Sequence, residues 1–324
     1  MTLRTPSETP RASPVQRAVV DWFAESARDL PWRRPGTSAW GVLVSEVMSQ
    51  QTPMSRVAPR WEEWLHRWPT PADLAAASPA EVLLAWDSLG YPRRALRLRE
   101  AAAAIAADHD NVVPVGEEVL RSLPGIGPYT AAAVTSFAHG TRTTVLDVNI
   151  RRVLHRIFAG RSHPAPAPST RERAWASAFV PQRSHVEWNA GTMELGALVC
   201  TSRRPACEEC PVAEHCRWLA AGKPIDPQRK PTTQAWNGTD RQLRGAVMAV
   251  LRSCGPAGVR TDLLTASARE LDAEALAALP DPVQQAIARV RELGSSERVA
   301  RLIADLIDDG LAERAAGNRL RLPG

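Results

Sequence analysis

Four closely spaced cysteines are the residues in this sequence best suited to bind a metal. Cys200, Cys207, Cys210 and Cys216 form the pattern C-x6-C-x2-C-x5-C. Iron–sulfur clusters are commonly held by four cysteine thiolates, whereas a structural zinc site usually pairs its ligands as two C-x2-C knuckles. Only Cys207 and Cys210 form such a knuckle. The spacing therefore favours a 4Fe–4S cluster, with zinc as the alternative, and the lack of an export signal argues against disulfides.

A glycine-containing turn is the second chemical feature. Residues 123–127 read Leu-Pro-Gly-Ile-Gly, and a helix is expected to begin directly afterwards at Pro128. Gly125 and Gly127 allow a tight turn with exposed backbone N–H groups, and the positive end of the following helix points the same way. This arrangement suits a DNA phosphate, although a plain connection between two helices has a similar pattern.

Helices are expected before the cysteine cluster and on either side of the glycine-containing turn, because apolar residues recur at helical spacing and strand-like alternation is scarce. The expected helices cover residues 15–27, 39–51, 60–68, 78–89, 93–107, 117–123, 128–139, 147–159, 171–179 and 185–198. The sequence thus predicts an all-α domain.

A change of composition indicates a second domain. All 11 tryptophans precede residue 237, and the region that follows is rich in Ala, Leu and Arg. The resulting division is a disordered tail over 1–14, a first domain over 15–222, a Pro-rich linker over 223–238 and a C-terminal domain over 239–324.

The C-terminal domain is expected to be winged-helix-like. A helix is predicted over 240–253, with two or three more across roughly 261–309, followed by a hairpin around the Gly-Asn pair in residues 310–322. Six arginines on candidate DNA-facing elements suggest phosphate contacts. They are Arg241, Arg244, Arg260, Arg314, Arg319 and Arg321.

The overall charge is compatible with a nucleic-acid partner. Forty Lys and Arg residues against 35 Asp and Glu residues give a formal net charge of +5. This excess alone does not distinguish DNA binding from a solvated basic surface. No apolar run approaches the length of a membrane span, so we expect a cytoplasmic protein with no membrane partner. We also expect a monomer, because nothing in the sequence suggests a dimer seam.

At this point the sequence resembles the helix-hairpin-helix DNA glycosylase superfamily. The hairpin of residues 123–127, the Val-Leu-Asp-Val-Asn run of 145–149 and the cysteine loop occur in the family's order. Ser45–Thr52 (Ser-Glu-Val-Met-Ser-Gln-Gln-Thr) and Leu89-Gly90-Tyr91 are similar to motifs of its MutY-type branch, the adenine DNA glycosylases. The resemblance covers roughly residues 21–218.

One position separates this branch from its bifunctional relatives. Enzymes such as endonuclease III carry a lysine two residues after the last glycine of the hairpin, and this amine attacks the sugar. Tyr129 stands there in this sequence. Without an amine no Schiff base forms, so the resemblance implies a monofunctional glycosylase.

The resemblance also implies a pair of catalytic carboxyl groups. Glu46 lies among apolar residues on its expected helix, so burial should raise its pKa and allow it to protonate adenine. Asp147 would stabilise or trap the oxocarbenium-like sugar. Tyr129 and Asn149 occupy positions that orient Asp147 and the intermediate. An isolated Glu46 would otherwise be a solvated residue, and Asp147 a helix N-cap.

The implied partner is double-stranded DNA with adenine opposite 8-oxoguanine or guanine, in base excision repair. The adenine must leave the duplex to be reached. Tyr91 matches a residue that wedges into the base stack, and Gln51 and Thr52 match residues that contact the opposite base. Leu89, Gly125 and Gly127 complete the implied DNA-binding set.

The sequence departs from the branch at a few places. Ala190 stands where Gln or Glu often reads the adenine, with Glu194 one turn further along, and Ser49 replaces a common Leu. The C-terminal region is shorter than the β-rich Nudix-like domain of many members. Two alternatives follow: a related mismatch glycosylase with another base specificity, such as uracil or thymine, or an iron–sulfur redox-sensing regulator that binds DNA.

Overall fold

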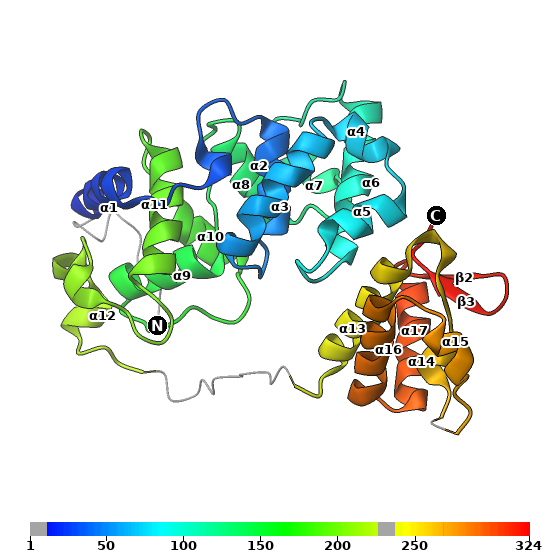
Figure 1. Cartoon of the computed structure of the whole chain (residues 1–324). Helices are drawn as coiled ribbons and strands as arrows, with labels where there is room; N and C mark the ends of the chain where they lie inside the picture. Colours follow the sequence, from blue (N-terminus) through cyan, green and yellow to red (C-terminus); the bar gives the residue numbers. More distant parts are fainter. Residues whose placement is uncertain (1–11, 226–236, 268) are drawn as a thin grey trace. The chain divides into compact units, whose positions relative to one another are not determined.

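The computed structural model describes residues 12–225, 237–267 and 269–324, and they are mostly helical. The chain divides into two compact units. The first contains residues 1–47 and 112–231, and the second contains residues 48–111 and 232–324. Each unit is therefore built from two separate stretches of sequence, and Figure 1 colours the chain by position along that sequence. None of the described helices has both the length and the apolar character that crossing a bilayer requires.

The first unit holds most of the predicted first-domain helices. Its elements are α1 (Ala12–Ser26), η2 (Pro31–Arg33), α2 (Ala39–Met48), α7 (Glu117–Ser122), α8 (Pro128–Phe137), α9 (Val148–Leu154), η3 (His155–Ala159), α10 (Thr170–Ser177), α11 (His185–Leu198), η4 (Cys207–Glu209), η5 (Ala213–His215) and α12 (Arg217–Ala220). The last residue of α2, Met48, falls just beyond the boundary of this unit.

Local sequence explains where several of these helices begin. Pro128 occupies the first turn of α8, where its missing N–H costs nothing. The side chain of Ser169 accepts a hydrogen bond from the Glu172 backbone and caps α10. The Ala-rich face of α8 is fully buried at Ala131–Ala133, which lets neighbouring elements approach closely.

Several predicted helix boundaries need correction. The helix expected over 60–68 begins at Met54, and the helix expected over 78–89 ends at Trp86. The helix expected over 39–51 ends at Met48, and Gln51 lies in a turn with φ of +55°. The helix expected over 147–159 is α-helical only to Leu154 and continues as a π-helical turn. The predicted tail over 1–14 overlaps the start of α1, while residues 1–11 and most of the predicted linker, 226–236, lie outside the described residues.

The stretch 48–111 of the second unit consists of four helices, α3 (Met54–Arg67), α4 (Pro71–Ala76), α5 (Pro79–Trp86) and α6 (Arg93–Asp108). The sequence did not predict α4, which is short but carries a complete capping box between Thr70 and Asp73. Trp64 forms edge-to-face contacts with Trp68 and Trp86, at ring-centroid distances of 4.6 and 5.6 Å. These rings form much of the local core.

The described residues of the C-terminal stretch form helices followed by short strands, as predicted, but four helices follow α13 where two or three were expected. Its elements are α13 (Asp240–Cys254), η6 (Gly255–Ala257), β1 (Val259–Arg260), α14 (Asp262–Thr265), α15 (Ala273–Ala277), α16 (Asp281–Leu293), α17 (Ser296–Asp308), β2 (Glu313–Ala315) and β3 (Arg319–Arg321). The predicted hairpin is present, with Gly317 and Asn318 both at positive φ. The strand β1 was not predicted, and it pairs antiparallel with β3 to give the order β1-β3-β2.

Most of the six C-terminal arginines that were candidates for phosphate contacts already have partners within the protein. Arg244 is paired with Asp309, Arg260 with Asp262 and Asp272, and Arg321 with Glu313. Arg319 donates to the carbonyl oxygens of Ala257 and Gly258. The guanidinium of Arg241 lies over the Tyr91 ring, 4.5 Å from its centroid. These contacts give the arginines partners within the protein, and their proposed contacts with DNA phosphates stay a prediction.

Candidate active site

The carboxyl group of Glu46 is enclosed by the core of the first unit. Glu46 is 8% exposed, on a helix whose neighbouring residues Leu43 and Val47 are buried. The Tyr129 hydroxyl, at the start of α8, donates a hydrogen bond to Glu46 Oε2 at 2.8 Å. The predicted burial of Glu46 is thus confirmed, and the enclosed carboxyl group keeps one polar partner.

Burial raises the pKa of Glu46 to about 7. The hydrogen bond from Tyr129 and the positive charge of Arg33 act against this rise, and the negative charge of Asp147 adds to it. Burial also raises the pKa of Tyr129 well above its usual value, so the phenol keeps its proton. A carboxyl group with a pKa near neutrality is suited to general acid catalysis.

Asp147 lies at the N-terminus of α9, where it is held by two hydrogen bonds. Its Oδ1 accepts from the Ile150 backbone N–H at 2.6 Å, and its Oδ2 accepts from Asn149 Nδ2 at 2.8 Å. Asp147 is therefore an N-cap, as the simplest interpretation of the sequence had it. The cap fixes the carboxylate in place and does not exclude a chemical role, since Asp147 also acts electrostatically on Glu46.

Opposing effects set the ionisation of Asp147. Burial raises its pKa above the usual range, while the hydrogen bonds from Ile150 and Asn149 and the charge of Arg152 lower it. The carboxylate is thus poorly solvated but well oriented. Such a group gains more from a nearby developing positive charge than a solvated carboxylate does.

A hydrogen-bond chain runs from Asp147 to the cysteine loop. Asn149 donates to Asp147, and Arg152 Nη2 donates to Asn149 Oδ1 at 2.8 Å. Arg152 also donates from Nε to the carbonyl oxygen of Cys200 at 2.8 Å and from Nη2 to that of Gly196 at 2.7 Å. The buried Arg152 therefore joins the N-terminal turn of α9 to the end of α11 and the first cysteine.

The helices α9 and α11 pack against each other and approach closely at Gly196. A β-carbon added to Gly196 would lie 2.7 Å from Asn149 Cβ and 3.1 Å from the Asn149 backbone. Real β-carbons do not approach other atoms so closely, so only glycine allows this packing. The position of Asn149, and through it that of Asp147, depends on a bare backbone at Gly196.

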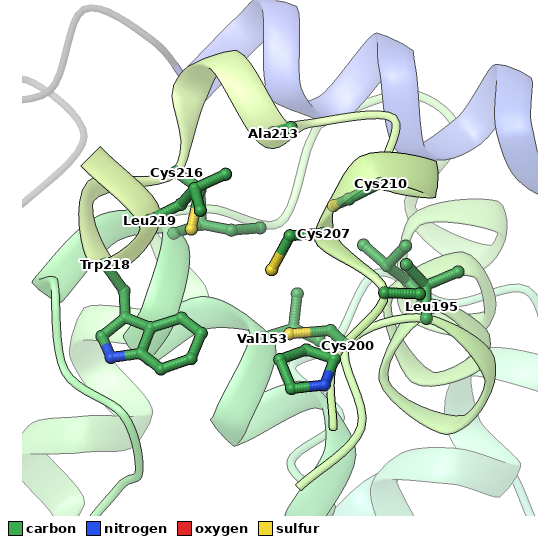
Figure 2. Close-up of a pocket in the computed structure, with 13 residues that line it drawn as sticks. Val153, Leu195, Cys200, Cys207, Cys210, Ala213, Cys216, Trp218 and Leu219 are labelled. Atoms are coloured by element: carbon green, nitrogen blue, oxygen red, sulfur yellow. The ribbon is translucent and has the colours of Figure 1, made fainter. Parts of the chain in front are cut away.

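Figure 2 shows the four cysteine side chains turned toward one shared hollow. The remaining walls are mostly apolar and include Val153, Leu195 and Trp218. Within the described ranges, no three His, Cys, Asp or Glu side chains converge as a single-ion site would require. Burial, together with the charges of the neighbouring cysteines, raises the pKa of the Cys210 thiol to about 12, so thiolates here need a cationic partner. Sulfurs spread around a hollow fit a multi-iron cluster better than one zinc ion.

Arg156 supports this loop from the π-helical turn. It is buried, and its Nη1 lies 3.3 Å from Cys200 Sγ and donates to the Thr201 carbonyl oxygen at 2.8 Å. Its guanidinium also lies over the Trp218 ring, 4.4 Å from the centroid. The loop is thus held to the helical core by a buried cation as well as by apolar contacts.

The predicted phosphate-binding hairpin links α7 to α8. Gly125 adopts φ of +74°, which other residues rarely adopt. Gly127 is the N-cap of α8 with an ordinary φ of −85°, and an added β-carbon would meet nothing within 4 Å. The turn therefore requires glycine at Gly125, while Gly127 leaves open space above the helix N-terminus, where an anion is favoured.

The predicted base-contacting residues lie in the second unit. Gln51 and Tyr91 both adopt positive φ, +55° and +50°, which is uncommon for residues with side chains and is typical of functional loops. Thr52 Oγ1 donates to the Leu89 carbonyl oxygen at 3.1 Å. The two loops are therefore held together, with the Tyr91 ring 41% exposed and Thr52 buried.

Arg94 strengthens this connection. It donates to the carbonyl oxygens of Met48 and Gly90 and to Thr52 Oγ1, at 3.4, 3.1 and 3.3 Å. Its guanidinium also lies within 5.6 Å of the Tyr91 ring centroid. One side chain thus spans the end of α2 and the loop that carries Tyr91.

Comparison with known proteins decides the family. Residues 44–177 match the HhH-GPD superfamily of base excision DNA repair proteins. The chain is 46% identical over 313 residues to the adenine DNA glycosylase of Mycolicibacterium smegmatis, covering 96% of each chain. It is 44% identical over 308 residues to that of Mycobacterium tuberculosis strain H37Rv, covering 94% of this chain and 92% of the relative.

The chain belongs to the adenine DNA glycosylase family.

Comparison with a solved structure supports the assignment of the fold. A thermostable thymine-DNA glycosylase superposes with a TM-score of 0.62 at 24% identity, covering 66% of this chain and 99% of its own. The predicted all-α helix-hairpin-helix fold is confirmed. Residues 200–216 match the iron–sulfur binding domain of endonuclease III. The predicted 4Fe–4S cofactor is confirmed in this member of the adenine DNA glycosylase family, and the zinc alternative is not supported.

Sequence reasoning missed the arginines that connect the site of this family member. Arg152, Arg156 and Arg94 are each bonded to two or more backbone carbonyl oxygens. For Arg152 and Arg156 the signal available was their placement among apolar residues, because a charged side chain in such a setting is either solvated or paired. Arg94 lies in an arginine-rich turn of α6 and gave no such signal. The spacing of residues in the sequence does not show which backbone carbonyl oxygens accept hydrogen bonds from these arginines.

Proposed function

We propose that the protein hydrolyses the N-glycosidic bond of adenine mispaired with 8-oxoguanine or guanine in duplex DNA. The observation that carries the proposal is the pairing of Glu46, bonded to Tyr129, with Asp147, bonded to Asn149, in one unit of the molecule. One carboxyl group is held near its protonated form and the other is held as an oriented acceptor. This division of roles is what glycosidic bond cleavage needs.

The reaction begins with proton transfer. Glu46 donates its proton to a ring nitrogen of the extruded adenine, which then leaves the sugar as a neutral base. The electron pair of the glycosidic bond goes to the base, and the sugar develops positive charge at its anomeric carbon. Asp147 stabilises or traps this charge, and water adds to the anomeric carbon, leaving an abasic site and returning a proton to the site.

We further propose that the enzyme is monofunctional. Tyr129 occupies the position of the attacking amine in bifunctional relatives, and its raised pKa keeps it a phenol that donates to Glu46. A phenol cannot form a Schiff base with the sugar. The backbone of the DNA is therefore left intact by this enzyme.

DNA contacts are assigned to three places. Tyr91 would enter the base stack at the lesion, with Leu89 beside it, and Gln51 and Thr52 would contact the base opposite adenine. The α7–α8 hairpin with Gly125 would hold a phosphate. The 41% exposure of Tyr91 and the open space at the N-terminus of α8 support the assignments of Tyr91 and of the hairpin. Leu89 and Thr52 are buried, so their assignments rest on the family resemblance alone.

The cluster loop has a supporting role in this proposal. Cys200, Cys207, Cys210 and Cys216 hold the 4Fe–4S cluster, whose iron–thiolate bonds fix the loop. Arg152 then binds the carbonyl oxygen of the first cysteine and keeps Asn149 in contact with Asp147. We also propose that residues 223–238 separate two domains, that the protein is a monomer and that it acts in the cytoplasm.

A panel of duplexes tests base specificity. Duplexes carry adenine opposite 8-oxoguanine, adenine opposite guanine, thymine opposite guanine or uracil opposite guanine, and abasic sites are cleaved with alkali after incubation. We expect strand breaks only where adenine is mispaired. Excision of thymine or uracil instead would assign the protein to the alternative mismatch specificity, and binding without excision of any base would favour a regulator.

A further inference from the structure

Arg156, in the π-helical turn η3, is a buried cation that has no carboxylate partner among the described residues. Only 1% of it is exposed. Its guanidinium donates to four backbone carbonyl oxygens, those of Ser162, Cys200, Thr201 and Ser202. These groups satisfy its N–H donors but carry no net charge. The positive charge of Arg156 therefore has no counter-charge among these contacts, and burial keeps water from solvating it.

A second arginine, five residues earlier on α9, shows how a buried cation is usually accommodated. Arg151 is 6% exposed and donates to both carboxylate oxygens of the buried Glu172, at 2.7 and 2.8 Å. Burying a charge is costly unless it is paired, and Glu172 provides that pair. The glutamates between Cys200 and Cys216 do not do the same for Arg156, because they are exposed and accept none of its hydrogen bonds.

Arg156 instead contacts the cysteines that hold the cluster. Its Nη1 lies 3.3 Å from Cys200 Sγ, and its backbone carbonyl oxygen accepts from the Cys216 thiol at 3.6 Å. Its guanidinium lies 4.4 Å from the centroid of the Trp218 ring. Figure 2 shows that Cys200 and Trp218 both line the hollow between the four cysteines. The charge of Arg156 is thus placed directly against the first cluster ligand and is shielded from solvent.

We propose that Arg156 provides a counter-charge for the iron–sulfur cluster and raises its reduction potential through the hydrogen bond to Cys200 Sγ. A cluster held by four thiolates carries a net negative charge, and both this charge and hydrogen bonds to the sulfurs set its potential. A cation at this place stabilises the reduced, more negative state more than the oxidised state. The inference concerns the cofactor and does not depend on which base the enzyme removes.

The test is the reduction potential of the purified holoprotein, measured on an electrode that supplies and accepts the electron. Arg156→Gln keeps a side chain that donates hydrogen bonds but removes the charge, so the potential should shift to a more negative value. Iron release to a chelator from the same preparation should become about 10-fold faster, the lower end of the loss in metal affinity when a residue bonded to a metal ligand is replaced. Arg156→Lys keeps the charge and should stay closer to wild type in both measurements.

Arg151→Gln is the matched control, because it also removes a buried arginine from this part of the chain. It leaves Glu172 buried without its cationic partner, so it should lower the Tm of the holoprotein. Since the carboxylate partner of Arg151 is not a cluster ligand, the potential and the rate of iron release should match those of the wild type. A purely structural role of Arg156 would give the same pattern in Arg156→Gln, a lower Tm with an unchanged potential.

An unchanged potential in folded Arg156→Gln holoprotein would overturn the inference. A shift of the same size in Arg151→Gln would also overturn it, because the effect would then follow from lost stability. If Arg156→Gln yields no folded holoprotein, Arg156→Lys decides the question. A retained cluster with a potential near that of the wild type supports charge compensation, whereas loss of the cluster in Arg156→Lys contradicts it, because the charge is still present. None of these measurements uses adenine excision, so their outcome is separate from that of the proposed function.

Discussion

Arg152 donates a hydrogen bond from Nε to the backbone carbonyl oxygen of Cys200 at 2.8 Å. The same guanidinium holds Asn149, which in turn holds Asp147. The position of the carboxylate proposed to stabilise the sugar is therefore coupled to the first cysteine of the cluster loop.

Glu46→Gln should abolish adenine excision while the protein still binds mismatched DNA. The amide keeps the size and polarity of the side chain but has no proton to give to the base, and loss of general acid catalysis costs about 10²- to 10⁴-fold in rate. Single-turnover excision and gel-shift binding to the same duplex measure the two properties. A rate within tenfold of wild type would refute the assignment of Glu46.

The pH profile of excision should be bell-shaped. Glu46 must be protonated, and its pKa of about 7 means that the rate falls as the pH rises above neutrality. Asp147 must be ionised, and burial raises its pKa, so the rate should also fall at an acidic pH above the usual range for aspartate. Because the two groups interact, the limbs report values for the pair. A rate that stays constant from pH 7 to 9 would contradict the acid role.

Borohydride should not trap the wild-type protein on its substrate. Trapping requires an imine between a protein amine and the sugar, and Tyr129 occupies the place of that amine. Denaturing gels of protein incubated with an adenine:8-oxoguanine duplex and borohydride provide the measurement, with a bifunctional glycosylase on its own substrate as the positive control. A covalent band that disappears in Glu46→Gln would show that an amine does act in this site.

Gly196→Ala should slow excision and destabilise the protein. The added methyl group would meet Asn149 at 2.7 Å, so α9 or α11 must shift, and such overpacking costs about 1–3 kcal/mol. Thermal unfolding and the excision rate are measured on the same preparation. Gly245→Ala on α13 is the matched control, because its added β-carbon meets nothing within 4 Å. Equal behaviour of the two variants would argue against the close packing at Asn149.

Cys207→Ser should lose the iron–sulfur cluster and much of the soluble yield. The cluster loop has mainly short 3₁₀ turns between its ligands, so iron–thiolate bonds supply much of its order. Iron and sulfide content, visible absorbance and soluble yield are compared with those of Cys254→Ser, a cysteine of α13 outside the loop. A Cys207→Ser protein with full iron and sulfide content would remove Cys207 from the ligand set.

The burial of Glu46 could be predicted from the sequence, whereas the hydrogen bonds that connect the site could not. Glu46 and Asp147 were identified because their motifs are long, and burial of Glu46 followed from its apolar neighbours. The end of α2 at Met48 was missed, because helical periodicity persists into Gln51 while the chain turns to a positive φ. The ion pairs of the C-terminal arginines were also missed, because pairs such as Arg321 with Glu313 form across a hairpin and not along a helix face.

The interleaving of the two units has a consequence for biosynthesis. Glu46 is made early, but the elements that enclose it begin only after residue 112, once the whole of residues 48–111 has been made. A nascent chain must therefore carry the apolar face of α2 without its final partners while a segment of the other unit emerges. Because exposed apolar surface promotes aggregation, this interval is the stage of synthesis at which chaperone binding to residues 39–48 would be most useful.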